Sequence, residues 1–107
     1  MVLKISSCVT GRNYLKVDSD SIFHALESGD ELKETLTKLK GIERVDDIGK
    51  YEICLKKGEL FEFNRELAER IAHAISEFSG STIEKLIIED EFFKSDMGRD
   101  LYEEIEM

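Results

Sequence analysis

The stretch from Arg65 to Ser79 constrains the fold most, because its apolar residues fall on one face of a helix. They recur at the three- and four-residue spacing of an amphipathic helix: Leu67, Ile71, Ala74, Ile75 and Phe78. Asn64 supplies a good N-cap before the helix, and Gly80 ends it. This is the clearest helix of the chain, and its stripe is expected to face the core.

Strand-like segments lie on both sides of this helix. Alternating or continuous apolar patterns predict four main strands, at residues 2–9, 42–46, 51–56 and 82–89. The second and third can pair as a hairpin across Asp47 to Lys50. Two short additions are expected at residues 14–17 and 60–63.

Three further helices are expected. A short one carries Ile22 to Leu26 and is broken at Gly29. Another begins at Asp30, turns its leucines inward and stops at Gly41 in the C′ role. The third is an amphipathic C-terminal helix, with Met97, Leu101 and Ile105 on one stripe.

The order of the main elements predicts an α+β fold of ferredoxin-like type, βαββαβ, with an antiparallel sheet and helices on one face. The length of 107 residues fits one domain, with a core over about 1–90 and an acidic helical extension over about 91–107. Many unrelated functions share this architecture, so it is a poor guide to chemistry.

The net charge of −9, from 24 acids against 15 bases, disfavours anionic partners. We therefore expect no DNA partner and regard RNA binding as unfavourable, since nucleic-acid affinity depends on Lys and Arg contacts to phosphate. Without a long apolar run or a signal-peptide pattern, the expected location is cytoplasmic, with no membrane contact. The absence of glutamine resembles thermophile composition, whereas the absence of proline argues against it.

The charge is distributed unevenly. The first 17 residues carry +3, whereas the stretch from Glu89 to Met107 holds eight acids against Lys94 and Arg99. Such asymmetry can serve self-association or an acidic tail that meets a basic partner. A solvated polar face is the simpler interpretation.

The loop Thr10, Gly11, Arg12 and Asn13 is the best candidate for ligand binding. Backbone N–H groups beside an arginine suit a phosphate or a carboxylate. The same residues are also ordinary turn formers, so a purely structural loop is the alternative.

The two cysteines, Cys8 and Cys54, are expected on the polar faces of their strands. In a ferredoxin-like sheet these strands are neighbours, so the thiols could bind a soft metal or oxidise reversibly. No further Cys or His ligands accompany them, so packing in an interface is the alternative reading and no metal or other cofactor is assigned.

The histidines give weaker signals. His73 lies between Glu69 and Glu77 on one helix face, where the three could hold a hydrated ion but more simply form surface ion pairs. His24 falls opposite Ile22 and Leu26, and nothing distinguishes it as a site residue.

No standard catalytic motif occurs, so we expect no enzyme. The favoured function is a small protein-interaction or regulatory domain that self-associates, as a dimer, or docks on another protein. One alternative is a domain that binds a small anion or a metal through Thr10 to Asn13 or the thiols. The other is an RNA-associated domain, for which five cations would have to share one face: Lys4, Arg12, Lys16, Lys56 and Lys57.

Overall fold

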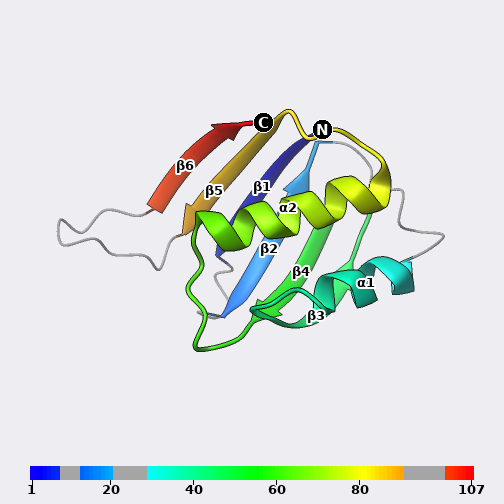
Figure 1. Ribbon diagram of the computed structural model, residues 1–107, viewed down its shortest axis with the longest axis vertical. Helices are drawn as coiled ribbons and strands as arrows, with labels where there is room; N and C mark the ends of the chain where they lie inside the picture. The colour runs from blue at the N-terminus through cyan, green and yellow to red at the C-terminus, as the bar shows by residue number, and fades with distance from the viewer. Residues whose placement is uncertain (8–12, 21–28, 91–100) are drawn as a thin grey trace.

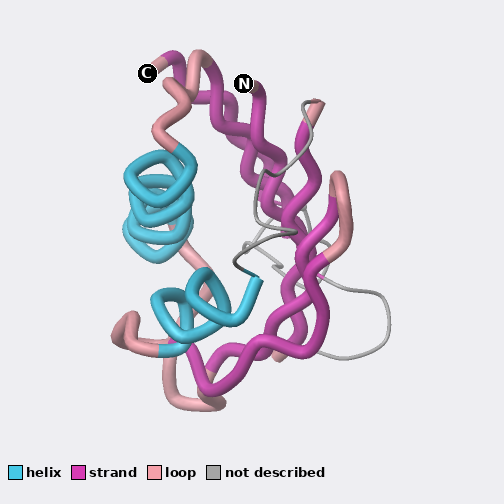
Figure 2. Tube along the Cα trace, turned by 90° about the vertical axis from the view of Figure 1, so that its right-hand side faces the viewer, coloured by secondary structure: helices cyan, strands magenta, loops and turns pink. Residues whose placement is uncertain are grey.

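The protein is described by a computed structural model that covers residues 1–7, 13–20, 29–90 and 101–107. It forms an α+β fold in which two helices lie on one face of a six-stranded mixed sheet (Figures 1 and 2). In chain order, the elements are β1 (Val2–Ser7), β2 (Tyr14–Ser19), α1 (Gly29–Thr37), β3 (Ile42–Ile48), β4 (Glu52–Lys57), α2 (Arg65–Ser79), β5 (Lys85–Asp90) and β6 (Leu101–Glu106).

The strands lie side by side in the order β3-β4-β2-β1-β5-β6 (Figure 1). All neighbouring pairs are antiparallel except β1 and β5, which run parallel in the middle of the sheet. The α+β class and the placement of the helices on one face are confirmed. The element order β1β2α1β3β4α2β5β6 and the parallel pairing of β1 with β5 show that the prediction of an antiparallel βαββαβ fold is wrong.

Strand β2 is the main reason for the difference. It returns from β1 as an antiparallel partner and then pairs with β4 on its other side. It therefore separates β1 from β4, the two strands that a ferredoxin-like sheet would have placed together. The short strand expected at 14–17 is thus longer than predicted and central.

The prediction of a C-terminal helix is also wrong, because Leu101–Glu106 forms strand β6, which is antiparallel to β5. The side chains of β6 alternate: Glu103 bonds Arg65 of α2, whereas Glu104 pairs with Lys85. A helix here would have left the edge of the apolar strand β5 without a neighbour. Residues 21–28 and 91–100, which include the predicted helix over Ile22 to Leu26, lie outside the described residues.

Helix α2 follows its sequence closely. The Asn64 side chain accepts a hydrogen bond from the Leu67 backbone N–H at 3.0 Å, and Gly80 adopts the left-handed conformation at the other end. The core lies between the sheet and the helices, and its largest fully buried side chains are Leu3, Ile5, Leu15, Leu32, Leu36, Ile53, Leu55, Ile71, Ile75, Leu86 and Ile88.

Helix α1 ends earlier than expected, at Thr37. Gly41 is separated from it by a turn and takes a positive φ of 98° just before β3. The hairpin of β3 and β4 is confirmed, with the Gly49 N–H donating to the Glu52 carbonyl at 2.7 Å. Among the described residues, no helix has the length and apolar character needed to cross a membrane.

Candidate functional site

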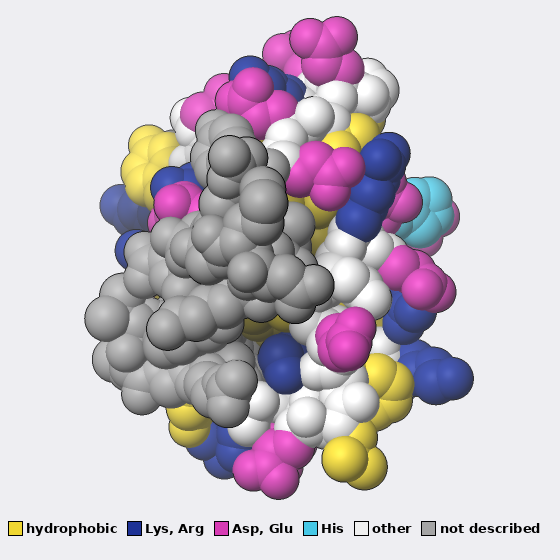
Figure 3. Space-filling model, turned by 90° about the vertical axis from the view of Figure 1, so that its left-hand side faces the viewer, with side chains coloured by type: hydrophobic (Ala, Val, Ile, Leu, Met, Phe, Trp, Pro, Cys, Tyr) yellow, Lys and Arg dark blue, Asp and Glu magenta, His cyan; other side chains and the backbone are white. Residues whose placement is uncertain are grey.

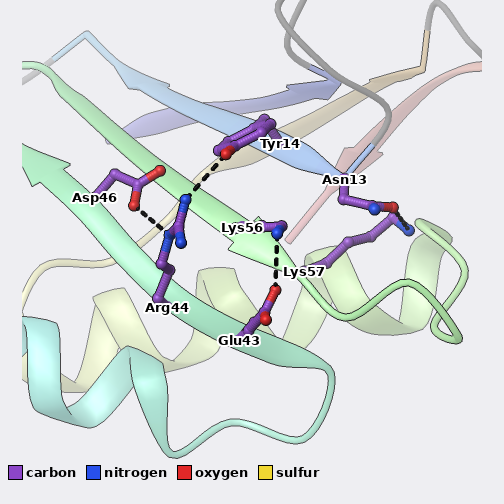
Figure 4. A network of polar contacts seen from close by, with 7 residues as sticks. All are labelled: Asn13, Tyr14, Glu43, Arg44, Asp46, Lys56 and Lys57. Atoms are coloured by element: carbon purple, nitrogen blue, oxygen red, sulfur yellow. Dashed lines mark hydrogen bonds and ion pairs between the residues drawn. The ribbon is translucent and has the colours of Figure 1, made fainter.

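The candidate site lies where β2, β3 and β4 meet the turn that follows β4 (Figure 4). It includes Asn13, the one residue of the predicted ligand loop that the structure describes. Thr10, Gly11 and Arg12 lie outside the described residues, so the loop as a ligand site stays a prediction.

Lys57 joins Asn13 to this turn. Its side chain is buried, with 8% exposed, and its Nζ donates to Asn13 Oδ1 at 3.2 Å and to the Phe61 carbonyl at 2.6 Å. The backbone N–H of Lys57 also donates to the Asn13 carbonyl at 2.8 Å. Asn13 thus lies against β4, and its amide oxygen already accepts a hydrogen bond from an ammonium group.

Two β-bulges in β3 determine which side chains reach the face of the sheet that points away from α1 and α2. The register shifts between Ile42 and Arg44 and again between Val45 and Asp47. A bulge places two residues opposite one, so Glu43 and Arg44 both point away from the helices. The strict alternation assumed from the sequence fails in β3 for this reason.

These bulges build a polar cluster around Tyr14. The Arg44 guanidinium donates to Tyr14 Oη at 2.9 Å and lies 6.0 Å from the ring centroid, while Lys56 Nζ lies 5.8 Å from it. Both distances fall within the range of cation–π attraction. The tyrosine ring therefore lies beside two cations from neighbouring strands (Figure 4).

Each of these cations also has a carboxylate partner. Arg44 Nε bonds Asp46 at 2.7 Å, and Lys56 Nζ pairs with Glu43 at 3.3 Å. The hydrogen bond that Arg44 donates to Asp46, together with the negative charge of Asp46, raises the pKa of Arg44. The cluster is therefore electrically balanced, which makes it a poor receptor for a free anion.

A hollow of about 570 Å³ opens beside this cluster. Its lining residues come from the start of β3, the end of β4 and the following turn: Gly41, Ile42, Glu43, Lys56, Gly58, Glu59 and Phe61. The Phe61 ring lies so close to two glycines that an added Cβ would be 3.2 Å from it at Gly41 and 3.1 Å at Gly58. The absence of side chains at these two positions therefore permits the ring to form one wall of the hollow.

The turn also exposes apolar side chains, which the sequence had placed in a strand over residues 60–63. Leu60 is 97% exposed and Phe61 is 38% exposed. The Gly58 N–H bonds the Gly41 carbonyl at 2.9 Å, and the Phe61 N–H bonds the Gly58 carbonyl at 3.1 Å. These bonds make a turn instead of a strand. A turn is expected around Gly58, but its extension through Leu60 to Phe61 depends on the bond to Gly41, which is distant in the sequence.

Cys54 lies on the face of β4 that points away from the helices, opposite to Ile53 and Leu55, as the alternation predicted. Its Sγ donates to Glu52 Oε1 at 3.5 Å, and Lys16 is its partner in the register of β2. Strand β1, which leads to Cys8, is one strand further away because β2 intervenes. The prediction that the strands of Cys8 and Cys54 are neighbours in the sheet is therefore wrong. Cys8 itself lies outside the described residues.

Glu69, His73 and Glu77 do not come together as one group of ligands. His73 Nε2 pairs with Glu77 Oε1 at 3.1 Å, whereas Glu69 accepts from Arg65 Nε at 2.8 Å. Within the described ranges, no group of three His, Cys, Asp or Glu residues is arranged to hold a metal ion. His24 lies outside those ranges.

A second hollow, of about 390 Å³, lies between the two helical segments. Leu39, Ala74 and Phe78 give it an apolar lining, and Arg70, His73 and Glu77 also border it. Arg70 is already engaged, because it bonds Glu66 at 2.6 Å and the Lys40 carbonyl at 3.0 Å.

Of the five cations proposed for RNA, Arg12 lies outside the described residues and the other four are divided between the two faces. Lys4, Lys16 and Lys56 point to the face away from α1 and α2, where each pairs with a carboxylate at 2.9–3.4 Å. Lys57 is buried on the other face. On the side of the molecule that Figure 3 shows, acidic and basic side chains are interleaved.

The clearest feature of the corner is thus an exposed apolar turn beside a hollow and a balanced polar cluster. The described titratable side chains of the cluster bond one another instead of converging on one reactive position. Comparison with models of known protein families, with curated proteins and with solved structures gives no match.

Proposed function

We propose that this chain is a non-enzymatic protein-interaction domain that associates with a second copy of itself. One observation carries the proposal: Leu60 and Phe61 are consecutive, both exposed, and lie beside a hollow of about 570 Å³. Single exposed apolar residues are common on protein surfaces, but apolar side chains gathered beside a concave surface are typical of contact sites.

The surroundings of this turn support a protein partner. Tyr and Arg are enriched among the residues that dominate binding energy at protein interfaces, and Tyr14 and Arg44 lie in the cluster next to the hollow. The carboxylates beside Arg44 and Lys56 reduce the attraction of the corner for phosphate. This favours a protein over RNA as the partner.

The other proposals depend on residues that the structure does not describe. Binding of a small anion requires Thr10 to Arg12, and a paired-thiol metal site requires Cys8. Both stay predictions. The described residues add no observation in their favour.

Sizing chromatography with light scattering tests the proposal. At low concentration the mass is expected to be 12.3 kDa, and it should rise toward twice that value as concentration increases. Added NaCl should strengthen the association, because it screens the repulsion between two chains of net charge −9. A constant monomer mass up to about 1 mM at every salt concentration would contradict self-association.

A further inference from the structure

Lys57 is a charged residue at a position where the pattern of β4 predicts an apolar one. The side chains of Ile53 and Leu55 are buried on the side of the helices, and Lys57 continues their alternation. A buried ammonium group is unfavourable unless hydrogen bonds replace the water that it loses. An apolar side chain would avoid this cost, so the contacts of the ammonium group must account for a lysine here.

The ammonium group of Lys57 bridges two segments that lie far apart in the sequence. Its Nζ donates to Asn13 Oδ1 at 3.2 Å and to the Phe61 carbonyl at 2.6 Å, and Figure 4 shows the first of these contacts. Asn13 lies 44 positions before Lys57, directly ahead of β2, whereas Phe61 lies four positions after it, in the exposed turn. One side chain therefore connects the start of β2 to this turn.

Backbone hydrogen bonds also hold the turn of residues 58–61, but apolar burial contributes little there. The Phe61 N–H donates to the Gly58 carbonyl at 3.1 Å, and the Gly58 N–H donates to the Gly41 carbonyl at 2.9 Å. Leu60 is 97% exposed, so its side chain adds almost no buried surface. Segments with little apolar burial open more readily than the core. Loss of the bond from Lys57 should therefore affect the turn more than the rest of the fold.

We infer that Lys57 is a latch that couples the conformation of the exposed turn to that of Asn13. If Asn13 Oδ1 is withdrawn, the ammonium group must move toward water or another acceptor, and its bond to the Phe61 carbonyl weakens. Displacement of the turn weakens the bond to Asn13 in the same way, because such coupling is reciprocal.

The coupling is a property of a single chain, whereas its regulatory role rests on the proposed function. The turn carries Leu60 and Phe61, the exposed apolar residues of the proposed contact. A change at Asn13 would alter how these two side chains are presented to a partner. The latch thus makes the start of β2 a place from which the contact can be regulated.

Amide exchange of the monomer at low concentration tests the latch. The Phe61 N–H reports on the turn, and the Gly49 N–H, which donates to the Glu52 carbonyl at 2.7 Å, is the reference at the other end of β4. Lys57→Met should speed exchange at Phe61 about tenfold or more relative to Gly49, because a hydrogen bond from a charged donor is lost. Lys56→Met, the control on the neighbouring residue, should change this ratio less than about twofold.

Substitutions of Asn13 test the coupling itself. Asn13→Leu keeps the size of the side chain and removes the acceptor, so it should speed exchange at Phe61 relative to Gly49. Asn13→Asp places a carboxylate beside the ammonium group, which forms a stronger hydrogen bond, and should slow that exchange. In the Lys57→Met background neither substitution should change the ratio, because the group that transmits the effect is gone.

The outcomes separate the latch from the proposed function. The latch is overturned if the two Asn13 variants shift the ratio in the same direction or leave it unchanged, or if their effects persist in the Lys57→Met background. A wild type that never dimerises contradicts the proposed function, while the exchange experiment still decides the coupling. Where the wild type dimerises, Asn13→Leu should weaken the dimer, and an unchanged affinity would overturn the regulatory role.

Discussion

The two faces of the sheet are built from the same strands but from different chemistry. Toward the helices, β1, β2, β4 and β5 present side chains that are almost completely buried, such as Ile5, Val17, Leu55 and Ile88. On the other face the same strands present charged residues that pair across neighbouring strands. Three of these pairs are diagonal in the strand register: Lys4 with Glu89, Lys16 with Glu52, and Lys85 with Glu104.

This difference separates two tasks. Apolar burial on the covered face supplies most of the folding free energy, because buried area dominates stability in a domain of this size. Exposed ion pairs contribute little individually, but like charges in cross-strand positions would be unfavourable. The charged face therefore favours one strand register. It also avoids an exposed apolar surface, which would promote non-specific association.

The sharpest test of this comparison uses two adjacent isoleucines of β5. Ile88 is fully buried on the covered face, whereas Ile87 is half-buried on the other. Ile88→Ala should lower the free energy of unfolding by about 2–5 kcal/mol, because it removes buried methyl groups and leaves a cavity. Ile87→Ala should cost less than half as much in urea unfolding, and equal losses would show that the two faces contribute alike.

A smaller effect is expected for the neighbouring lysines of β4. Lys57→Met removes the ammonium that bonds Asn13 and the Phe61 carbonyl, and should cost about 1–3 kcal/mol. Lys56→Met removes a pair with Glu43 on the charged face and should cost at most about 1 kcal/mol. Thermal unfolding of both variants shows which one loses more stability. A larger loss for Lys56→Met than for Lys57→Met would show that the charged face stabilises the sheet more than the buried ammonium does.

The smallest effect concerns Lys16, whose side chain is 39% exposed. The charge of Asp18, followed by that of Glu52, raises the pKa of Lys16 above its usual value of 10.5. The stabilisation that these ion pairs of Lys16 give the folded state is therefore complete below pH 10.5. It is lost as pH rises through the pKa that Lys16 has in the folded state. Relative to Lys16→Met, the wild type should gain at most about 0.5 kcal/mol at pH 7, and this gain should shrink in unfolding experiments at higher pH.

Local features of the sequence predicted the elements whose determinants lie within a few residues. The boundaries of α2 follow from Asn64 and Gly80, and the alternation in β4 correctly placed Ile53 inside and Cys54 outside. The hairpin at Gly49 is equally local.

Features that depend on distant partners were missed. Nothing near Tyr14 indicates that β2 pairs with β4, whose residues follow more than thirty positions later. Leu101 and Ile105 fit a helical stripe and also the alternation of a strand, and only the edge of β5 decides between them. At the candidate site, Leu60 and Phe61 suggested a strand because the bond between Gly58 and Gly41 joins residues far apart in the chain.

The parallel pairing of β1 with β5 also has a consequence for the order of folding. The N-terminal amine bonds the Thr82 carbonyl, 81 residues along the chain, and β1 then continues beside β5. Closing so long a loop has an entropic cost that precedes the gain from these contacts. During synthesis, β1 and β2 can pair with each other and with β4, but the second edge of β1 has no partner until β5 has left the ribosome, so β5 determines when the sheet is completed around β1.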